Sequence, residues 1–302
     1  MMMAKAGFHI NQRSFEPLHI VTGRQIQGNE SNSTRGYKDV SLHQKPRYAI
    51  VRRVPNTFSQ CITMEKLSKG IDLRLARQQH SEYIRVLKEL VDEVIELPMD
   101  DAYPDCPFVE DTAVVSGSTA LVTRPGAASR RGEVEVVRET LKFLGLKVFE
   151  VCSPGLLDGG DVLHVDGMLL VGKSRRTNDE GVQALASAFP EMQVVPVEVS
   201  EGLHLKSVLS FVGQHTLVVE ETHNAQEMVR IIQQACMLES IMVSIPGAAN
   251  VLRVGNTIVY PSFYGRDWES QYMLFAEKVI PVDISEFHKG DGGLTCLSII
   301  IP

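Results

Sequence analysis

The chain has 302 residues, enough to bury a substantial core as one large domain or two of ordinary size. Its hydrophobic fraction of 44% and charged fraction of 22% are typical of a soluble globular protein. No apolar stretch approaches the roughly 20 residues that cross a bilayer, which argues against a membrane protein. The net charge of -7 and the isoelectric point near 5.7 leave no basic surface for nucleic acid.

The first 46 residues differ in character from the rest of the chain. Basic residues outnumber acidic ones there, and the stretch "QGNESNSTRGYKD" is polar without a hydrophobic period, as flexible chain is. We therefore predict a flexible extension over 1–46 and a single folded domain over 47–302. A cytoplasmic location is expected, and the basic composition of the extension leaves a mitochondrial location open as the alternative.

From residue 46 onward, strand-like and helix-like segments alternate in a repeating order. Strands are indicated by short apolar runs and helices by apolar residues at helical spacing. The first round comprises a strand (46–55), a helix (73–91), a strand (92–98), a hairpin (106–126), a helix (129–145) and a strand (146–151).

The order of hairpin, helix and strand then recurs. Three more rounds are predicted, at 159–173, 179–189 and 192–199, at 203–221, 224–236 and 240–246, and at 249–262, 270–278 and 279–285. The last apolar stretch, 294–301, lacks a following partner. We expect it to pair with the first strand and so close the repeats into a ring.

A functional side chain precedes each of the inner strands of these repeats. These residues are Glu110, Asp161, His204, Asn250 and Cys296, at successive separations of 51, 43, 46 and 46 residues. Repeats of this length are typical of circular arrays, in which equivalent positions face a common axis. A reduced cysteine is most often a small core residue, but this spacing predicts that the thiol of Cys296 meets the acids and the histidine at one end of the axis.

Five motifs of the chain resemble those of the dimethylarginine dimethylaminohydrolase family: "PDCPFVEDTAVV", "TRPGAASRR", "LDGGDVLHVDGMLLVGKSRRTN", "EGLHLKS" and "DGGLTC". The resemblance extends from about residue 47 to the C-terminus. That family belongs to the guanidine-modifying, or pentein, superfamily. The resemblance therefore implies an α/β fold, a five-bladed propeller of pseudo-fivefold ββαβ modules, and hydrolysis of N-methylated arginines to citrulline and an amine.

The resemblance also implies roles for individual residues. For catalysis it implies Cys296 as nucleophile, His204 as general acid and base, and Asp158 as the group that orients His204. For substrate binding it implies Asp105, Glu110 and Asp111 around the guanidinium, Arg130 and Arg176 on the α-carboxylate, and Asp291 in the loop that holds the amino-acid portion.

These residue types suit the chemistry of a guanidinium, a flat cation whose carbon resists nucleophiles. Paired carboxylates fix its plane through short charge-assisted hydrogen bonds. A thiolate forms near neutral pH more readily than an alkoxide, and a neighbouring cation favours it further. A histidine can protonate the departing amine and then activate water, with a carboxylate holding its other nitrogen.

No cofactor is expected, because the mechanism needs none and neither a P-loop nor a dinucleotide-binding glycine motif is present. No metal is required, although Cys296 and His204 could bind an inhibitory zinc ion. The expected partner is a small-molecule substrate, methylated arginine, with neither nucleic acid nor membrane. Monomer and homodimer both stay open.

The loop "VPNTFSQCITM" (54–64) stands where the family has a mobile lid, and Thr63 falls where an aliphatic contact is expected. Preference among dimethylarginine, monomethylarginine and arginine therefore stays open. An arginine deiminase or related guanidine hydrolase of the superfamily is the alternative, because it would share the nucleophile, histidine and acids. A non-enzymatic propeller that binds a partner is a second alternative. It predicts that the nucleophilic cysteine, the histidine and the acids are absent from the strand starts.

Overall fold

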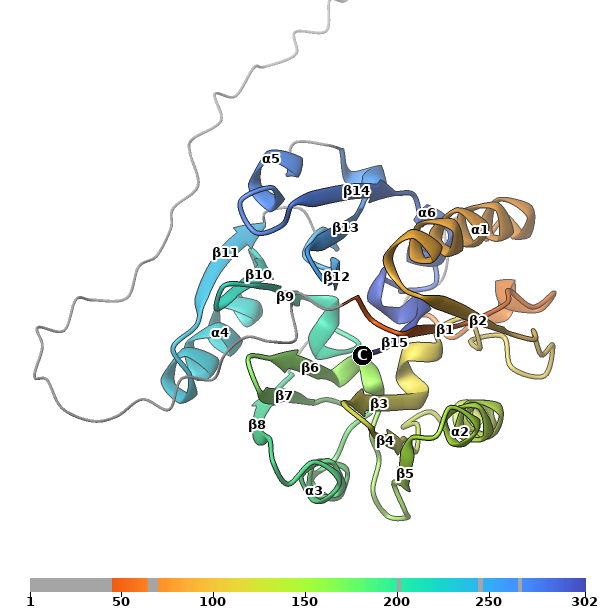
Figure 1. Cartoon of the computed structure of the whole chain (residues 1–302), viewed down its shortest axis with the longest axis horizontal. Coiled ribbons are helices and arrows are strands. Elements are labelled where there is room, and N and C mark those ends of the chain that lie inside the picture. The colour runs from red at the N-terminus through yellow and green to blue at the C-terminus, as the bar shows by residue number, and fades with distance from the viewer. Residues whose placement is uncertain (1–44, 65–69, 200–201, 244–246, 266–267) are drawn as a thin grey trace, which may run out of the picture.

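Five small sheets surround one axis in the computed structural model of the chain (Figure 1). The structure describes residues 45–302 apart from 65–69, 200–201, 244–246 and 266–267. Within these residues each sheet has three strands. The predicted extension therefore lies almost wholly outside the described residues, and the predicted domain boundary stays a prediction.

Each sheet pairs an antiparallel inner strand with a middle strand, and the middle strand with a parallel outer strand. A parallel pair needs a crossover, and a helix supplies it in each module. The sheets are β15 (Ile299–Ile301), β1 (Tyr48–Arg52) and β2 (Glu93–Leu97); β3 (Ala113–Ser116), β4 (Thr119–Val122) and β5 (Lys147–Glu150); β6 (Val162–Val165), β7 (Met168–Lys173) and β8 (Gln193–Glu198); β9 (Leu209–Gly213), β10 (Thr216–Glu220) and β11 (Glu239–Val243); and β12 (Leu252–Val254), β13 (Thr257–Pro261) and β14 (Lys278–Val282).

The crossover helices lie at the periphery of the ring, outside the sheets (Figure 1). Polar side chains begin three of them: Asp72 accepts two backbone N–H groups of the first turn of α1, and Asn178 and Thr222 cap α3 and α4. The α-helices are α1 (Leu73–Leu90), α2 (Val134–Phe143), α3 (Asp179–Ala188), α4 (His223–Ala235), α5 (Glu269–Tyr272) and α6 (Ser285–His288).

Short 3-10 turns precede four of the five inner strands and bring the predicted site residues to one end of the axis. These turns are Val109–Thr112, Gly159–Asp161, Leu205–Ser207 and Thr295–Leu297. Three further 3-10 turns lie elsewhere, at Phe58–Gln60, Ala128–Glu133 and Ser262–Tyr264.

The ring closes between the two ends of the described chain, as the repeats predict. Strand β15 pairs antiparallel with β1, in a register that places Ile301 opposite Tyr48. The predicted helix over 270–278 is wrong in length, since α5 ends at Tyr272. Met273 and Leu274 beyond it are exposed, and the chain turns back so that the backbone N–H of Glu277 reaches Asn256. The short helix α6 was not predicted.

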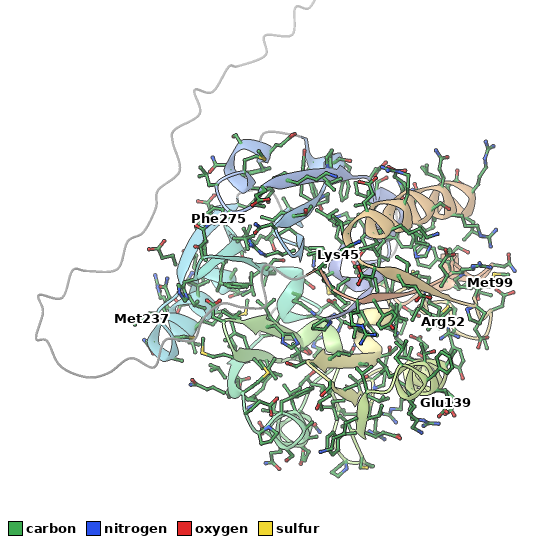
Figure 2. All side chains as sticks on the ribbon, viewed as in Figure 1. Lys45, Arg52, Met99, Glu139, Met237 and Phe275 are labelled. Carbon is green, nitrogen blue, oxygen red and sulfur yellow. The ribbon has the colours of Figure 1, made fainter. Side chains whose placement is uncertain are left out.

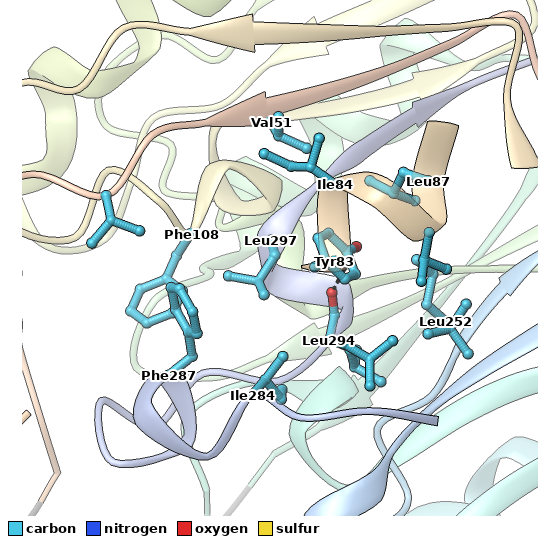
Figure 3. Close-up of a cluster of buried hydrophobic side chains, with 14 of the residues drawn as sticks. Val51, Tyr83, Ile84, Leu87, Phe108, Leu252, Ile284, Phe287, Leu294 and Leu297 are labelled. Carbon is cyan, nitrogen blue, oxygen red and sulfur yellow. Dashed lines mark hydrogen bonds between the residues drawn. The ribbon is translucent and has the colours of Figure 1, made fainter. Parts of the chain in front are cut away.

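The turn that carries Cys296 is anchored in an apolar cluster beneath α1 (Figure 3). Leu294 and Leu297, on either side of the cysteine, are fully buried in this cluster. The hydroxyl of Tyr83 donates to the carbonyl of Leu294 at 3.0 Å and lies 2.8 Å from the hydroxyl of Ser298. Burial of each leucine is worth roughly 1.5–3 kcal/mol, so the backbone around the cysteine is held firmly.

None of the described helices combines the length and the apolar character needed to cross a bilayer. The cytoplasmic or mitochondrial location stays a prediction.

Candidate active site

A narrow cavity of about 20 Å³ lies beside the turn of Cys296. It is walled by side chains from several modules of the ring, which the sequence separates by up to about two hundred residues. Seven of the residues singled out by the resemblance line it: Asp105, Asp111, Arg130, Arg176, His204, Asp291 and Cys296. Ile62, Phe108, Leu203, Gly290 and Gly292 complete the wall.

His204 is buried and pairs with a carboxylate of the neighbouring module. Its Nε2 lies 2.9 Å from Oδ2 of Asp158, which is completely buried. The other oxygen of Asp158 accepts the backbone N–H of Gly126 at 2.8 Å, which fixes the carboxylate. Burial alone would lower the pKa of His204, but the carboxylates of Asp111, Asp158 and Asp161 outweigh it and raise that pKa to about 9. The imidazole therefore carries a proton at neutral pH.

Asp111 lies between this imidazole and a buried guanidinium. Its Oδ1 accepts the backbone N–H of Gly160 at 2.9 Å and lies 3.9 Å from Nε2 of His204. Its Oδ2 accepts from Nη1 of Arg130 at 2.6 Å. Burial raises the pKa of Asp111, but the two neighbouring cations outweigh burial and lower that pKa to about 2. Asp111 is therefore a fixed negative charge on the cavity wall.

Arg130 is largely occupied by protein groups. Its Nε and Nη2 donate to the carboxylate of Glu133, with the shortest distance 2.9 Å, and Nη2 also donates to the carbonyl of Phe108 at 2.9 Å. Together with Asp111, these acceptors engage most of the five donors that a guanidinium has. Arg130 was expected to bind an α-carboxylate; the structure places it in the wall with few donors left.

Arg176 is better placed to bind an anionic group. Within the described residues its buried Nη1 has no hydrogen-bond partner, although it lies 3.6 Å from Oδ2 of Asp158. Its backbone is tightly packed, because a Cβ on Gly126 would come within 2.5 Å of the Cα of Arg176. Arg176 thus adds a fixed cation to the cavity wall, with its Nη1 buried beside Asp158.

Glu110, in contrast, does not line this cavity. Its Oε1 accepts from Nζ of Lys206 at 2.6 Å, and its Oε2 accepts from the hydroxyl of Thr295 at 3.0 Å. Consecutive side chains of a 3-10 turn point in different directions, so Asp111 faces the cavity and its neighbour faces away. In this arrangement the carboxylate of Glu110 is bonded to Lys206 and Thr295 and does not face the cavity in which a guanidinium is expected to bind.

A larger cavity of about 980 Å³ follows the inner strands along the axis. Lys45, near the centre of the ring in Figure 2, lies in its wall. Glu110, Lys206 and Thr295 also line this larger cavity, while their close neighbours in sequence line the small one. The hydrogen-bonded set of these three residues therefore forms the partition between the two cavities.

Cys296 is partly exposed and accepts a backbone N–H from Gly293 at 3.4 Å. All five cysteines of the described chain are free thiols. Burial, followed by the carboxylates of Glu110 and Asp111, raises the pKa of Cys296 to about 12. The sulfur is therefore protonated at neutral pH when no cation lies beside it. A cation bound beside it would offset the carboxylates and favour the thiolate.

The lid loop is tied to the cavity by two carboxylates. Asp105 accepts the backbone N–H of Ile62 at 3.0 Å, and Asp291 accepts that of Met64 at 2.5 Å. The aliphatic contact expected at Thr63 is provided by its neighbour Ile62, which lines the cavity. Asp291 holds a left-handed backbone conformation, with φ of 59°, which non-glycine residues adopt rarely.

Comparison with known proteins shows which family the chain belongs to, although no protein-family model matches it. A protein of Pseudomonas aeruginosa, named N(G),N(G)-dimethylarginine dimethylaminohydrolase, is 32% identical over 260 residues, which cover 84% of this chain and 98% of that protein. A protein of the same name from Streptomyces coelicolor is 36% identical over 256 residues, covering 83% and 95%. The chain belongs to the dimethylarginine dimethylaminohydrolase family. The predicted family and the prediction that the chain is an enzyme are confirmed.

Solved structures agree with the predicted fold of the family. A mutant of the Pseudomonas aeruginosa enzyme complexed with citrulline has a TM-score of 0.75 and 30% identity, and covers 85% of this chain and all of that chain. The N-terminal domain of ArgZ, a cyanobacterial arginine dihydrolase, also has a TM-score of 0.75, at 17% identity over 84% of this chain and 97% of that one, which shows likeness of fold alone. The prediction of a pentein propeller is confirmed.

Several residues of the site were not predicted from sequence. Glu133 lies three residues after Arg130, a spacing that signals contact on one helical face. Lys206 follows His204 by two residues, and Thr295 directly precedes Cys296, but neither carries a motif signal of its own. Asn250 had a signal, since it occupies one of the five equivalent positions, yet no role followed from its residue type.

The three donors Asp111, Asp158 and His204 lie within 4.8 Å of one another and form a set that could hold a metal ion. The carboxylates already accept hydrogen bonds from Arg130, Gly126 and Gly160, so they need no cation. The expected inhibitory zinc at Cys296 and His204 stays a prediction.

Proposed function

We propose that the enzyme hydrolyses N-methylated arginines, asymmetric dimethylarginine and monomethylarginine, to citrulline and dimethylamine or methylamine. The observation that carries this proposal is the single narrow cavity shared by the thiol of Cys296, the imidazole of His204 and fixed carboxylates. A small-molecule substrate is consistent with the citrulline complex of the Pseudomonas aeruginosa relative. Whether the protein is a monomer or a homodimer is left to measurement.

The two ends of such a substrate match the two kinds of charge in the cavity wall. Asp111, ionised and fixed by Gly160 and Arg130, pairs with the guanidinium. Arg176, the second cation of the wall, pairs with the α-carboxylate. Asp105 and Asp291 supply negative charge near the α-ammonium group and hold the lid above it. Arg130 acts mainly by fixing Asp111 and by adding positive charge.

The first step is attack of sulfur on the guanidino carbon. Binding of the cation lowers the pKa of Cys296, and the thiol proton leaves to solvent. The thiolate forms a C–S bond, giving a tetrahedral adduct. His204, protonated at neutral pH, gives its proton to the methylated nitrogen, and the C–N bond breaks to release a neutral amine. A covalent thiouronium on Cys296 remains.

The second step returns the enzyme to its starting state. His204, now neutral, takes a proton from water, and the resulting hydroxide attacks the same carbon. The C–S bond breaks as the hydroxyl proton of the adduct passes to the departing sulfur, which releases neutral citrulline and the thiol of Cys296. Asp158 holds the imidazole and stabilises its charged form throughout. A dimethylarginine dimethylaminohydrolase adduct with S-methyl-L-thiocitrulline has been solved, at a TM-score of 0.74 to this chain, and supports covalent chemistry at such a site.

Citrulline release from asymmetric dimethylarginine, monomethylarginine and plain arginine tests the proposal. The wild type should release citrulline from the methylated substrates, and Cys296→Ala should release none. Cys152→Ala is the matched control, because Cys152 is exposed and outside the cavity. Release mainly from plain arginine would reassign the enzyme as a deiminase. Absence of release from all three by reduced, zinc-free wild type would sink the proposal and favour a binding protein.

A further inference from the structure

The side chain of Asn250 bridges the loop of the histidine and the loop of the nucleophile. Its Nδ2 donates to the carbonyl of Lys206 at 2.8 Å and to the hydroxyl of Thr295 at 3.0 Å. Its Oδ1 accepts the backbone N–H of Thr295 at 3.1 Å. Asn250 is 4% exposed, so these bonds form away from water. One amide thus holds a residue two positions after His204 and the residue directly before Cys296.

The same side chain packs against the start of the nucleophile's turn. A Cβ on Gly293 would lie only 2.4 Å from Cγ of Asn250, so the glycine backbone rests directly on the amide plane. The N–H of that glycine donates to the sulfur of Cys296 at 3.4 Å. Asn250 therefore supports both ends of the turn: the N–H group that touches the sulfur, and the residue that precedes it.

Equivalent positions of other modules make the same kind of bond to the next module. Asp161 accepts the backbone N–H of Leu205, directly after His204, at 2.9 Å. Asn250 differs because it is an amide, which donates as well as accepts. An aspartate there would lose both donated bonds and would place a third carboxylate near Glu110 and Cys296.

We propose that Asn250 is a positioning residue that sets the sulfur of Cys296 relative to the imidazole of His204. This inference rests on the proposed function for its kinetic consequences but not for its geometry. Loss of the amide lets the turn of Cys296 shift, and displacement of a reacting atom by about 1 Å costs on the order of 100-fold in rate. The substrate's contacts with Arg176 and Asp111 are untouched.

Asn250→Leu tests the inference, because leucine has similar size and no charge but makes none of the three bonds. We expect kcat for asymmetric dimethylarginine to fall about 100-fold while KM changes less than about threefold. The rate of alkylation of Cys296 by iodoacetamide at about pH 9, followed by peptide mass spectrometry, should fall, because the N–H of Gly293 no longer supports the thiolate.

Asn178→Leu is the matched control. Asn178 also makes three hydrogen bonds, to Leu156, Pro154 and Gly181, but at the start of α3. This variant should lose thermal stability while keeping the wild-type kcat and the wild-type alkylation rate. The control therefore separates lost stability from lost positioning.

Thr295→Val provides a second variant if Asn250→Leu does not fold. It removes the bond that Asn250 donates to the hydroxyl, together with the bond from that hydroxyl to Glu110, and keeps the backbone N–H. A decrease in kcat of about 10-fold with unchanged KM is expected. Wild-type kcat and an unchanged alkylation rate in either folded variant would overturn the inference. Alkylation needs no turnover, so slower alkylation of the variant in an enzyme that releases no citrulline would support the positioning role while sinking the proposed function.

Discussion

The imidazole of His204 and the carboxylate of Asp158 lie 2.9 Å apart in a site where neither is accessible to bulk water. This pair comes from neighbouring modules of the ring, and its geometry is fixed on the acid's side by the backbone N–H of Gly126. In the proposed reaction, the proton that the departing amine needs is therefore held on an imidazole whose positive charge the neighbouring carboxylates stabilise.

Asp158→Asn should separate the charge of this carboxylate from its shape. The amide oxygen can still accept from Gly126, but the negative charge beside His204 is lost. We expect the pKa of His204 to fall and kcat to decrease by roughly 100- to 10,000-fold. NMR titration of the histidine and steady-state kinetics would measure both effects. Asp179→Asn, at the exposed start of α3, is the control, and equal losses in both variants would contradict the assigned role.

Loss of the proton from His204 should make the enzyme less stable at alkaline pH. Its pKa is about 9 in the folded state against 6.5 for the ordinary side chain, so the folded state binds the proton more tightly. The stabilisation is fully present below about pH 6.5 and is lost as the pH rises through 9. It amounts to something on the order of 3 kcal/mol. Chemical unfolding between pH 6 and 10 should show this decline in the wild type and not in His204→Gln.

Removal of the Glu110 charge should make Cys296 more reactive. This carboxylate follows burial as a cause of the high pKa of the thiol, so Glu110→Gln should lower that pKa and speed alkylation at pH 8. The variant also leaves Lys206 without its partner, at a cost on the order of 3 kcal/mol in unfolding free energy. The double variant Glu110→Gln/Lys206→Met should recover part of that stability. An alkylation rate that does not rise would contradict the electrostatic account.

Asp291→Gly should loosen the lid without straining the backbone. Glycine accepts the left-handed conformation freely, but the hydrogen bond to Met64 is lost. We expect faster limited proteolysis within 54–64 and an increase of about 10-fold in KM. Asp166→Gly is a matched control, since Asp166 also has a positive φ, of 42°, in the turn between β6 and β7. Equal proteolysis of the lid in both variants would show that Asp291 does not hold it.

The periodic order of the sequence was sufficient to predict the ring and its closing pair of strands. It was also sufficient to bring Cys296 and His204 to one cavity, because equivalent positions in a circular repeat must face the same axis. These are properties of spacing, which a sequence displays directly.

The sequence was not sufficient where direction within a turn decides the outcome. Glu110 and Asp111 are neighbours of the same charge, yet Glu110 belongs to the wall of the larger cavity and Asp111 lines the small one. Ile62 rather than Thr63 reaches the cavity because the lid is displaced by one residue from the expected register. The donors of Arg130 are occupied by Glu133 because both side chains are buried together. Burial of such a charged pair depends on all the elements that form the cavity wall.

The pairing of β15 with β1 has a consequence for how the enzyme acquires activity. The strand that follows Cys296 is held by the first strand of the described chain, a contact between residues almost the full length of the ring apart. Contacts of such long separation form late, because a large loop must be closed first. A refolding molecule would hold most of its secondary structure before it could turn over substrate. The time course of recovered catalytic activity would then report closure of the ring, and it would lag behind any spectroscopic signal from the helices.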